Sequence, residues 1–247
     1  MTDHAPIIIA TFGAAEALGW STLFELDTVL ADRWFLIGGE LIRLHAAEAG
    51  VTPPRPTVDV DIVVNLQTRP DGLRVLADWL IGRGFTHADP TPGGLGGRYV
   101  AATTDGSAVF DVLATDHAGT RADLTTTPPA RTVEVPGSRS VAGQIEAVHV
   151  RAATASGVAW RPHLAATLVL KARASNLPAR GGRDVSDAAF VASLIADPIA
   201  ARHSLSDRQR SHLRRLDMLL DADHPAWVAL DDAAATRGHA ALTLMLA

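Results

Sequence analysis

The 247-residue sequence contains no cysteine, a single lysine, few aromatic residues and no long apolar run. Without cysteine, disulfides, thiolate nucleophiles and cysteine-bound zinc are excluded. A membrane span would need roughly 18–20 consecutive apolar residues. The first residues lack a basic segment before a short isoleucine run, so we expect no signal peptide there. We therefore expect a cytoplasmic protein.

The charged residues are unusual in kind. The net charge of −5 argues against a protein that coats nucleic acid through its overall charge. All 22 basic residues except Lys171 are arginine. Lysine carries a compact, mobile ammonium that can meet a phosphate as a point charge, which the planar guanidinium does not duplicate. The histidines lack the spacing of zinc ligands, and no serine lies in a G-x-S-x-G setting.

The apolar periodicity predicts an α/β (α+β) fold, with a mixed sheet flanked by helices and then a mostly helical region. We expect one domain over residues 1–150 and a helical region over 151–247 that completes the active site. Helices are expected near 14–31, 40–48, 71–83, 163–175, 184–195, 206–221 and 225–236. Strands are expected near 34–37, 58–64, 98–103, 107–113 and 132–135.

Asp59-Val60-Asp61 places two acids at alternate positions of a β-rich stretch. Residues i and i+2 of a strand point to the same face, so both carboxylates project together. Neighbouring like charges repel and are costly to desolvate, and a bound divalent cation, Mg²⁺ or Mn²⁺, relieves both problems. The alternative is an edge strand whose outer face is wet.

Gly38-Gly39 ends a short apolar strand and precedes a helix. Glycines there let backbone N–H groups approach phosphate oxygens, and the helix N-terminus favours negative charge. Asp111 lies in a later apolar strand and adds a third acid to the two in D-x-D. Three carboxylates can share two metal ions for in-line displacement at phosphorus. We therefore predict nucleotide contacts at the glycines and metal ligands at Asp59, Asp61 and Asp111.

The order strand, G-G, helix, D-x-D strand and later acidic strand resembles the nucleotidyltransferase fold superfamily related to DNA polymerase beta. The resemblance covers about residues 34–113. The gap between Gly39 and Asp59 is longer than in the shortest members and includes the proline-rich segment VTPPRP. Many relatives carry Ser or Thr shortly before D-x-D, and Thr57 takes this place, which implies a role in nucleotide binding.

The second half is similar to the AbiEii/AbiGii nucleotidyltransferase toxin family, which carries a K…R…(R/K)-D-x-x-D arrangement. The matching residues are Lys171, Arg180 and Arg183-Asp184-Val185-Ser186-Asp187. The resemblance implies that Lys171 holds the triphosphate and that Asp187, or else Asp184, completes the active site. From the residues alone, Lys171 could be a surface lysine with its charged end in water. The two acids could simply favour the helix dipole.

The resemblance implies a Mg²⁺-dependent enzyme that moves a nucleoside monophosphate from an NTP to an acceptor hydroxyl. It further implies that the acceptor is the 3′ end of tRNA and that the enzyme is a toxin with a separately encoded antitoxin. A small molecule such as an antibiotic, or a protein side chain, is the alternative acceptor. Outside the enzymes, the alternative is a catalytically silent nucleotide-binding module.

An RNA acceptor would need local arginines, because the chain as a whole is negative. By their proximity in sequence to the motifs, Arg55, Arg98, Arg173 and Arg180 are the candidates. The arginines over 208–215 are interpreted as belonging to a solvated helix. At about 100° per residue, those at 208 and 215 share one side and those at 210 and 214 lie roughly opposite.

Overall fold

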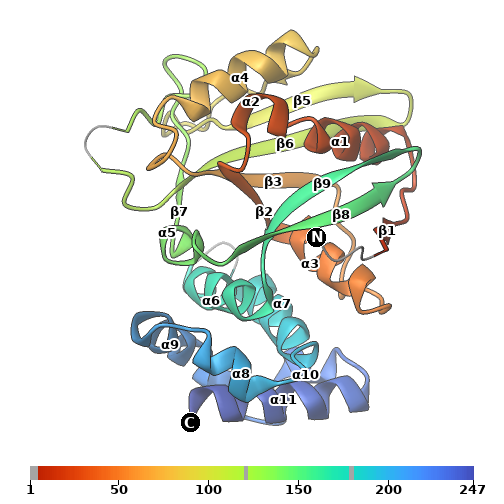
Figure 1. The fold of residues 1–247 in the computed structure, drawn as a ribbon, viewed down its shortest axis with the longest axis vertical. Coiled ribbons are helices and arrows are strands. Elements are labelled where there is room, and N and C mark those ends of the chain that lie inside the picture. The colour runs from red at the N-terminus through yellow and green to blue at the C-terminus, as the bar shows by residue number, and fades with distance from the viewer. Residues whose placement is uncertain (1–4, 120–121, 178–180) are drawn as a thin grey trace.

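Two sheets build the first two thirds of the chain in the computed structural model, which describes residues 5–119, 122–177 and 181–247 (Figure 1). One is a mixed six-stranded sheet of order β2-β3-β6-β5-β4, with β7 paired to β6, and the other has order β1-β8-β9. The strands are β1 (Ile7–Ile9), β2 (Trp34–Ile37), β3 (Asp59–Val64), β4 (Thr86–His87), β5 (Arg98–Thr103), β6 (Gly106–Thr115), β7 (Glu134–Val135), β8 (Ile145–Ala152) and β9 (Ala155–Pro162). The α/β class expected from the sequence is confirmed.

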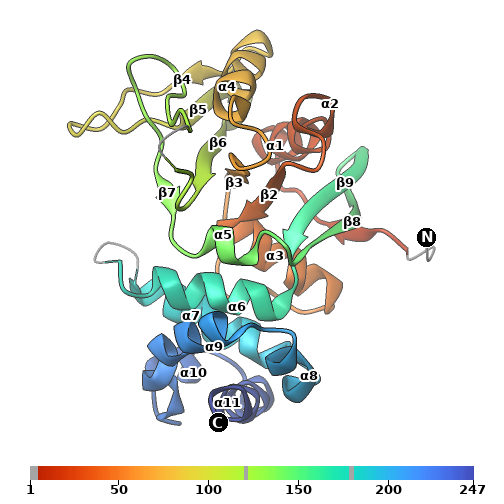
Figure 2. The ribbon, with the colours of Figure 1, turned by 60° about the vertical axis from the view of Figure 1, so that its left-hand side comes forward.

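The helices divide between the sheets and a separate helical layer. Those within the sheet part are α1 (Ala14–Phe24), α2 (Asp27–Leu30), α3 (Gly38–Glu48), α4 (Gly72–Gly82) and α5 (Ser138–Val141). The layer below the sheets contains α6 (Leu164–Ala174), α7 (Gly181–Ser193), α8 (Pro198–His203), α9 (Asp207–Leu213), the 3₁₀ helix η1 (Arg214–Leu220), α10 (Pro225–Val228) and α11 (Asp232–Leu246). Figure 2 shows α6 and α7 directly beneath the sheet part, with the remaining helices under them. No helix in the described ranges is long and apolar enough to cross a membrane.

The alternation of side chains in β3 assigns its two faces to two cores. Val60, Ile62 and Val64 pack with α1 and α4 in one apolar cluster, while Val63 belongs to the cluster built by α6 and α7. Asp61 shares the face of Val63, because residues two apart in a strand point the same way. The acids of D-x-D therefore lie on the face that is turned toward the helical layer.

The structure differs from the sequence prediction mainly between residues 138 and 162. The antiparallel pair β8–β9 was not predicted. Its turn contains Ala153 at φ 51°, a left-handed conformation usually taken by glycine or asparagine, so the usual turn signal is missing. The predicted boundary at residue 150 falls inside β8, and the change from sheet to helix comes at His163. Three predicted helices are each divided: 14–31, 206–221 and 225–236.

Candidate active site

The three predicted carboxylates lie on one face of two adjacent strands. β3 and β6 are parallel neighbours, with Asp61 opposite Asp111 and Asp59 opposite Val109. Because paired residues in a ladder and residues two apart in a strand share a face, all three acids project together. β3 lies between β2 and β6, so the alternative of a wet edge strand is wrong.

Arg98 on β5 connects two of these acids. It is the cross-strand partner of Asp111, and its Nε and Nη2 donate to the two oxygens of that carboxylate at 2.8 and 2.7 Å. Nη2 also donates to Oδ2 of Asp59 at 3.0 Å. The pKa of Arg98 is raised above its ordinary value, first by the hydrogen bonds to Asp111 and then by the surrounding carboxylate charges. The guanidinium thus offsets the repulsion within the acid cluster.

Gly38 and Gly39 bring the start of α3 against these acids. β2 ends at Ile37, and Gly38 then takes φ 69°, which a residue with a side chain rarely adopts. A Cβ on Gly38 would overlap the carboxylate of Asp61, and one on Gly39 would overlap the hydroxyl of Thr57. The two glycines therefore allow a close approach, and the structure brings Thr57 and Asp61 to the N-terminus of α3.

Glu40, in the first turn of α3, was not singled out by the sequence analysis. Its side chain is 2% exposed, Oε1 accepts from Nη1 of Arg43 at 3.1 Å, and Oε2 has no partner among the described residues. Burial raises the pKa of Glu40 from 4.5 to about 7; Arg43 opposes this rise, and Glu16 and Asp61 add to it. The sequence shows an acid directly after Gly38-Gly39, but it does not show that this acid is buried, because burial depends on tertiary packing.

Glu40→Gln should change how stability depends on pH. With a folded pKa of about 7 and an ordinary value of 4.5, folded Glu40 binds more protons than the unfolded residue between these pH values. The free energy of unfolding therefore falls as pH rises through this window, by about 3 kcal/mol, and is level above it. Urea denaturation from pH 4.5 to 8 should show this fall in the wild type and a flatter profile in the variant. Identical profiles would contradict the assignment.

A second charged cluster joins α6, α7 and the segment before β3. Nζ of Lys171 lies 2.8 Å from Oδ2 of Asp187 and 3.1 Å from Oδ1 of Asp184. Arg55 reaches the same Asp187 carboxylate with Nη2 at 3.0 Å and Nε at 3.3 Å. The side chains of Asp187 and Lys171 are 0% and 8% exposed, so the alternative of a surface lysine is wrong. Arg180 lies outside the described residues.

Arg55 also links this cluster to the first one. Burial by itself would lower the pKa of Arg55, but its hydrogen bonds to Asp187 and the charges of Asp187, Asp184 and Asp61 together raise it. Asp61 on β3 thus acts on a side chain that is bound to α7. The structure brings together the acids, glycines, threonine and lysine predicted as site residues, in two clusters that Arg55 connects.

Lys171→Arg tests how tightly the ammonium is enclosed. Lys171 is buried between two carboxylates, and the larger guanidinium has a different shape and hydrogen-bond geometry. Overpacking of this kind costs about 1–3 kcal/mol, so the free energy of unfolding should fall by this amount in urea denaturation. Arg173→Lys, on the same helix, is the control and should be nearly neutral. Unchanged stability of Lys171→Arg would show that the space around the Lys171 ammonium has room for a guanidinium.

Carboxylate oxygens suit Mg²⁺ or Mn²⁺, and three carboxylate side chains lie on this face. In the described part of the chain, however, no group of three His, Asp or Glu side chains is arranged to hold a metal ion. Two of the three acids instead face the guanidinium of Arg98. The carboxylate oxygens are the kind of donor that a divalent cation takes, but their arrangement here is that of partners of Arg98. No protein-family model matches the chain, and no curated protein matches it significantly.

Proposed function

We propose that the chain is a metal-dependent nucleotidyltransferase that moves a nucleoside monophosphate from an NTP to an acceptor hydroxyl. The observation that carries this proposal is the placement of Asp61 opposite Asp111 on parallel strands, with Asp59 on the same face. Gly38 adds the start of a helix beside Asp61. The carboxylates would supply oxygen ligands for a cation, and the backbone N–H groups of the helix N-terminus would supply donors for phosphate oxygens.

Each residue of the candidate site would have a separate role in the proposed reaction. Asp59, Asp61 and Asp111 would hold Mg²⁺ or Mn²⁺, which when bound offsets charge that develops on the phosphoryl oxygens. Backbone N–H groups at Gly38 and Gly39 would donate to the phosphates, because the N–H groups in the first turn of a helix have no acceptors within the helix. The acceptor oxygen bonds to the α-phosphorus, the bond from that phosphorus to the leaving oxygen breaks, and pyrophosphate departs. Asp111 would accept the hydroxyl proton, or it would help to hold a second cation while the proton passes to water.

Arg98 would have to change partners in this reaction. It occupies the carboxylates of Asp59 and Asp111 that a cation would use, and turning away would free its guanidinium for phosphate. Lys171 donates to Asp184 and Asp187, which leaves the third N–H of its ammonium for a triphosphate oxygen. The cluster around Asp187 otherwise serves to fix α7 against the catalytic sheet.

We further propose the 3′ end of tRNA as the acceptor and a toxin role with a separately encoded antitoxin. The support is the similarity of Lys171 and the following R-D-x-x-D segment to the AbiEii/AbiGii family. A small molecule or a protein side chain is the alternative acceptor. Incubation with each labelled NTP, Mg²⁺ and total tRNA separates these cases by which molecule becomes labelled, and a silent module would label none.

Asp59→Asn should abolish stabilisation by Mg²⁺ or Mn²⁺ with NTP. Binding to the folded state alone raises the free energy of unfolding by about 2.7 kcal/mol at 100 times Kd, which a thermal shift detects. Without ligands, the variant should lose less than about 1 kcal/mol, because the ion pair of Asp59 with Arg98 is partly exposed. A strongly destabilised ligand-free variant would mean that the acid is structural.

A further inference from the structure

Four arginines near the junction of the two layers have no acidic partner. They are Arg139 on α5, Arg173 on α6, Arg208 on α9 and Arg215 on η1. None forms an ion pair with an Asp or Glu in the part of the chain that the structure describes. In a chain with a net charge of −5, they make a local excess of positive charge. We call these four residues the arginine surface.

Helix geometry and packing bring the arginine surface together. Arg208, His212 and Arg215 are spaced i, i+4 and i+7, so they share one side of the segment that runs from α9 into η1. α9 packs against α6, which carries Arg173. Burial first, and then the charges of Arg173, Arg208 and Arg215, lower the pKa of His212. The interpretation of residues 208–215 as merely solvated is therefore incomplete.

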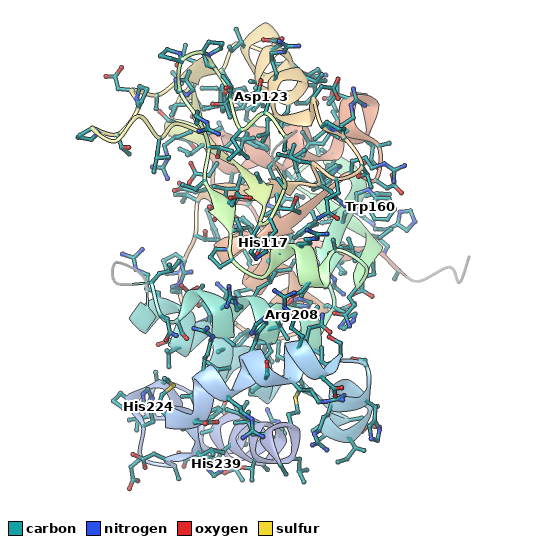
Figure 3. The ribbon with its side chains drawn as sticks, turned by 90° about the vertical axis from the view of Figure 1, so that its left-hand side faces the viewer. His117, Asp123, Trp160, Arg208, His224 and His239 are labelled. Atoms are coloured by element: carbon teal, nitrogen blue, oxygen red, sulfur yellow. The ribbon has the colours of Figure 1, made fainter. Side chains whose placement is uncertain are left out.

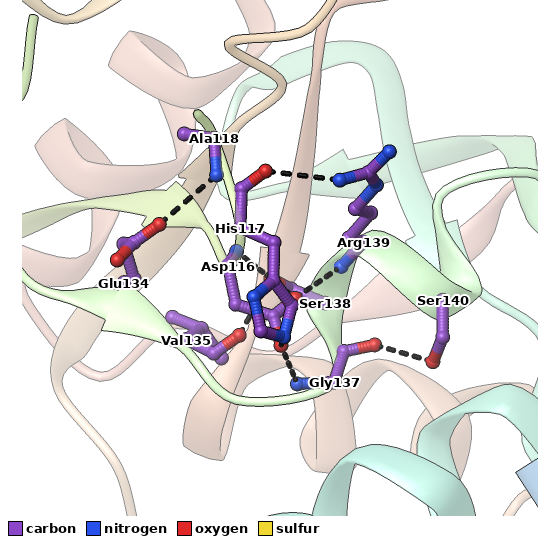
Figure 4. A network of polar contacts seen from close by, with 9 residues as sticks. All are labelled: Asp116, His117, Ala118, Glu134, Val135, Gly137, Ser138, Arg139 and Ser140. Carbon is purple, nitrogen blue, oxygen red and sulfur yellow. Dashed lines mark hydrogen bonds and ion pairs between the residues drawn. The ribbon is translucent and has the colours of Figure 1, made fainter. Parts of the chain in front are cut away.

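Hydrogen bonds around α5 hold Arg139, its member of the arginine surface, in place. Asp116, at the end of β6, accepts hydrogen bonds from the backbone N–H groups of Gly137 at 2.7 Å and Arg139 at 2.8 Å (Figure 4). Nη1 of Arg139 donates to the carbonyl of His117 at 3.0 Å. A Cβ on Gly137 would lie 2.8 Å from Cγ of Arg173, so this glycine leaves room for the Arg173 side chain. Figure 3 shows His117 and Arg208 on the same face of the molecule.

The arginine surface lies across α6 from the charged cluster of the candidate active site. Lys171 and Arg173 are two residues apart on α6, about 200° around the helix, so they point to nearly opposite sides. A helix with its side chains is about 10–12 Å across. Residues 165–172 of α6 are buried, and the helix becomes partly exposed only from Arg173 onward, so a strand of nucleic acid bound along the surface would pass the C-terminal end of α6 to reach the candidate active site.

We propose that the arginine surface binds the phosphate backbone of an RNA whose end enters the active site. This proposal rests on the nucleotidyltransferase function proposed above and adds the place where the acceptor docks. The four neighbouring guanidinium groups repel one another, the single charge of Asp116 beside them offsets this only in part, and phosphate groups would relieve the rest. Guanidinium matches phosphate geometry with two parallel hydrogen bonds. Of the arginines expected to meet RNA that the structure describes, Arg55 and Arg98 are bound to acids, whereas Arg173 forms no ion pair with a described acid.

The test compares two charge-matched double variants. Arg208→Gln with Arg215→Gln removes two cations from the surface. Arg214→Gln with Arg237→Gln removes two exposed arginines elsewhere, one of them on the same η1 segment. Binding of labelled unfractionated tRNA is measured by fluorescence anisotropy between 50 and 200 mM salt. The surface variant should bind about tenfold more weakly, with a salt slope smaller by about 1.4–1.8, and the control should match the wild type.

The possible outcomes test the docking surface and the proposed reaction separately. Equal losses in both double variants, or none in the surface variant, would overturn the proposal. So would wild-type protein that binds vesicles containing phosphatidylserine but no RNA. The nucleotide-dependent thermal shift should be the same in all variants, since these arginines do not touch the acid cluster. If RNA binds through the surface but NTP with Mg²⁺ gives no shift, the proposed reaction fails while the docking surface stands.

Discussion

Asp187→Asn should lower the free energy of unfolding by about 3–5 kcal/mol, the cost of breaking a buried ion pair by removing one partner. The Asp187 side chain is fully buried and its two oxygens receive Lys171 and Arg55. Asparagine keeps the shape but loses the charge, and its amide donors face cations that also donate. Lys171 would keep only the more exposed Asp184. The fully buried end of the network would be left with excess positive charge.

Urea denaturation of three variants separates this effect from a general loss of polarity. Asp184→Asn removes the same charge from the same helix, but Asp184 lies nearer to solvent, and Lys171 is its one ion-pair partner among the described residues. It should cost about 1–2 kcal/mol less than Asp187→Asn. Adding Lys171→Met to Asp187→Asn should recover part of the loss, because the unpaired ammonium is then absent. Equal losses for the two aspartates, or no recovery, would show that Asp187 is not the centre of the network.

The position of this network gives it a role beyond stability. It joins α6 and α7 to the segment before β3 through Arg55, and the charge of Asp61 acts on the same arginine. Charges, rather than apolar contacts alone, therefore connect the helical layer to the acid cluster. A change in the charge near Asp61, such as a bound cation, would change the electrostatic potential at Arg55, the side chain that binds Asp187 on α7.

The local part of the fold was readable from the sequence. β2, β3 and the β5–β6 hairpin were predicted within one or two residues of their limits, because short apolar runs mark the strands and the turn dipeptide Asp105-Gly106 lies within one residue of the observed turn, Thr104-Asp105. The shared face of Asp59 and Asp61 follows from strand geometry alone. The strand order that places Asp111 beside Asp61 did not follow from any local pattern, since it depends on parallel pairing between strands far apart in sequence.

Side-chain partners were the least readable part of the candidate site. Arg98 and Asp111 are 13 positions apart, and Arg55 and Asp187 are 132 apart, so neither contact follows from helix or strand spacing. Burial of Glu40 results from packing of α3 between the sheets and the helical layer. β8 and β9 escaped prediction because alanine-rich strands have weak alternation and the turn at Ala153 lacks glycine.

Asp61→Asn and Asp111→Asn should each reduce nucleotide transfer by about 10³-fold or more, equivalent to about 4 kcal/mol of transition-state stabilisation. Both acids share the face that we propose holds the cation, and each faces the other across parallel strands. Single-turnover transfer from labelled NTP, at saturating Mg²⁺, measures this loss directly. Asp78→Asn, an exposed acid on α4, is the control and should retain wild-type turnover.

Arg98→Gln distinguishes a catalytic role of Asp111 from a role as the partner of Arg98. If Asp111 serves only to bind the guanidinium, removing either member of the pair should impair transfer to the same extent. If Asp111 binds the cation, Arg98 competes for its oxygens, and the glutamine variant should need less Mg²⁺ for half-maximal activity. A titration of transfer rate against Mg²⁺ separates the two cases. Equal impairment of both variants with an unchanged Mg²⁺ requirement would reduce Asp111 to a structural residue. A lower Mg²⁺ requirement in Arg98→Gln, even if its maximal rate falls because a phosphate contact is lost, would identify the arginine as a counter-ion that a metal replaces.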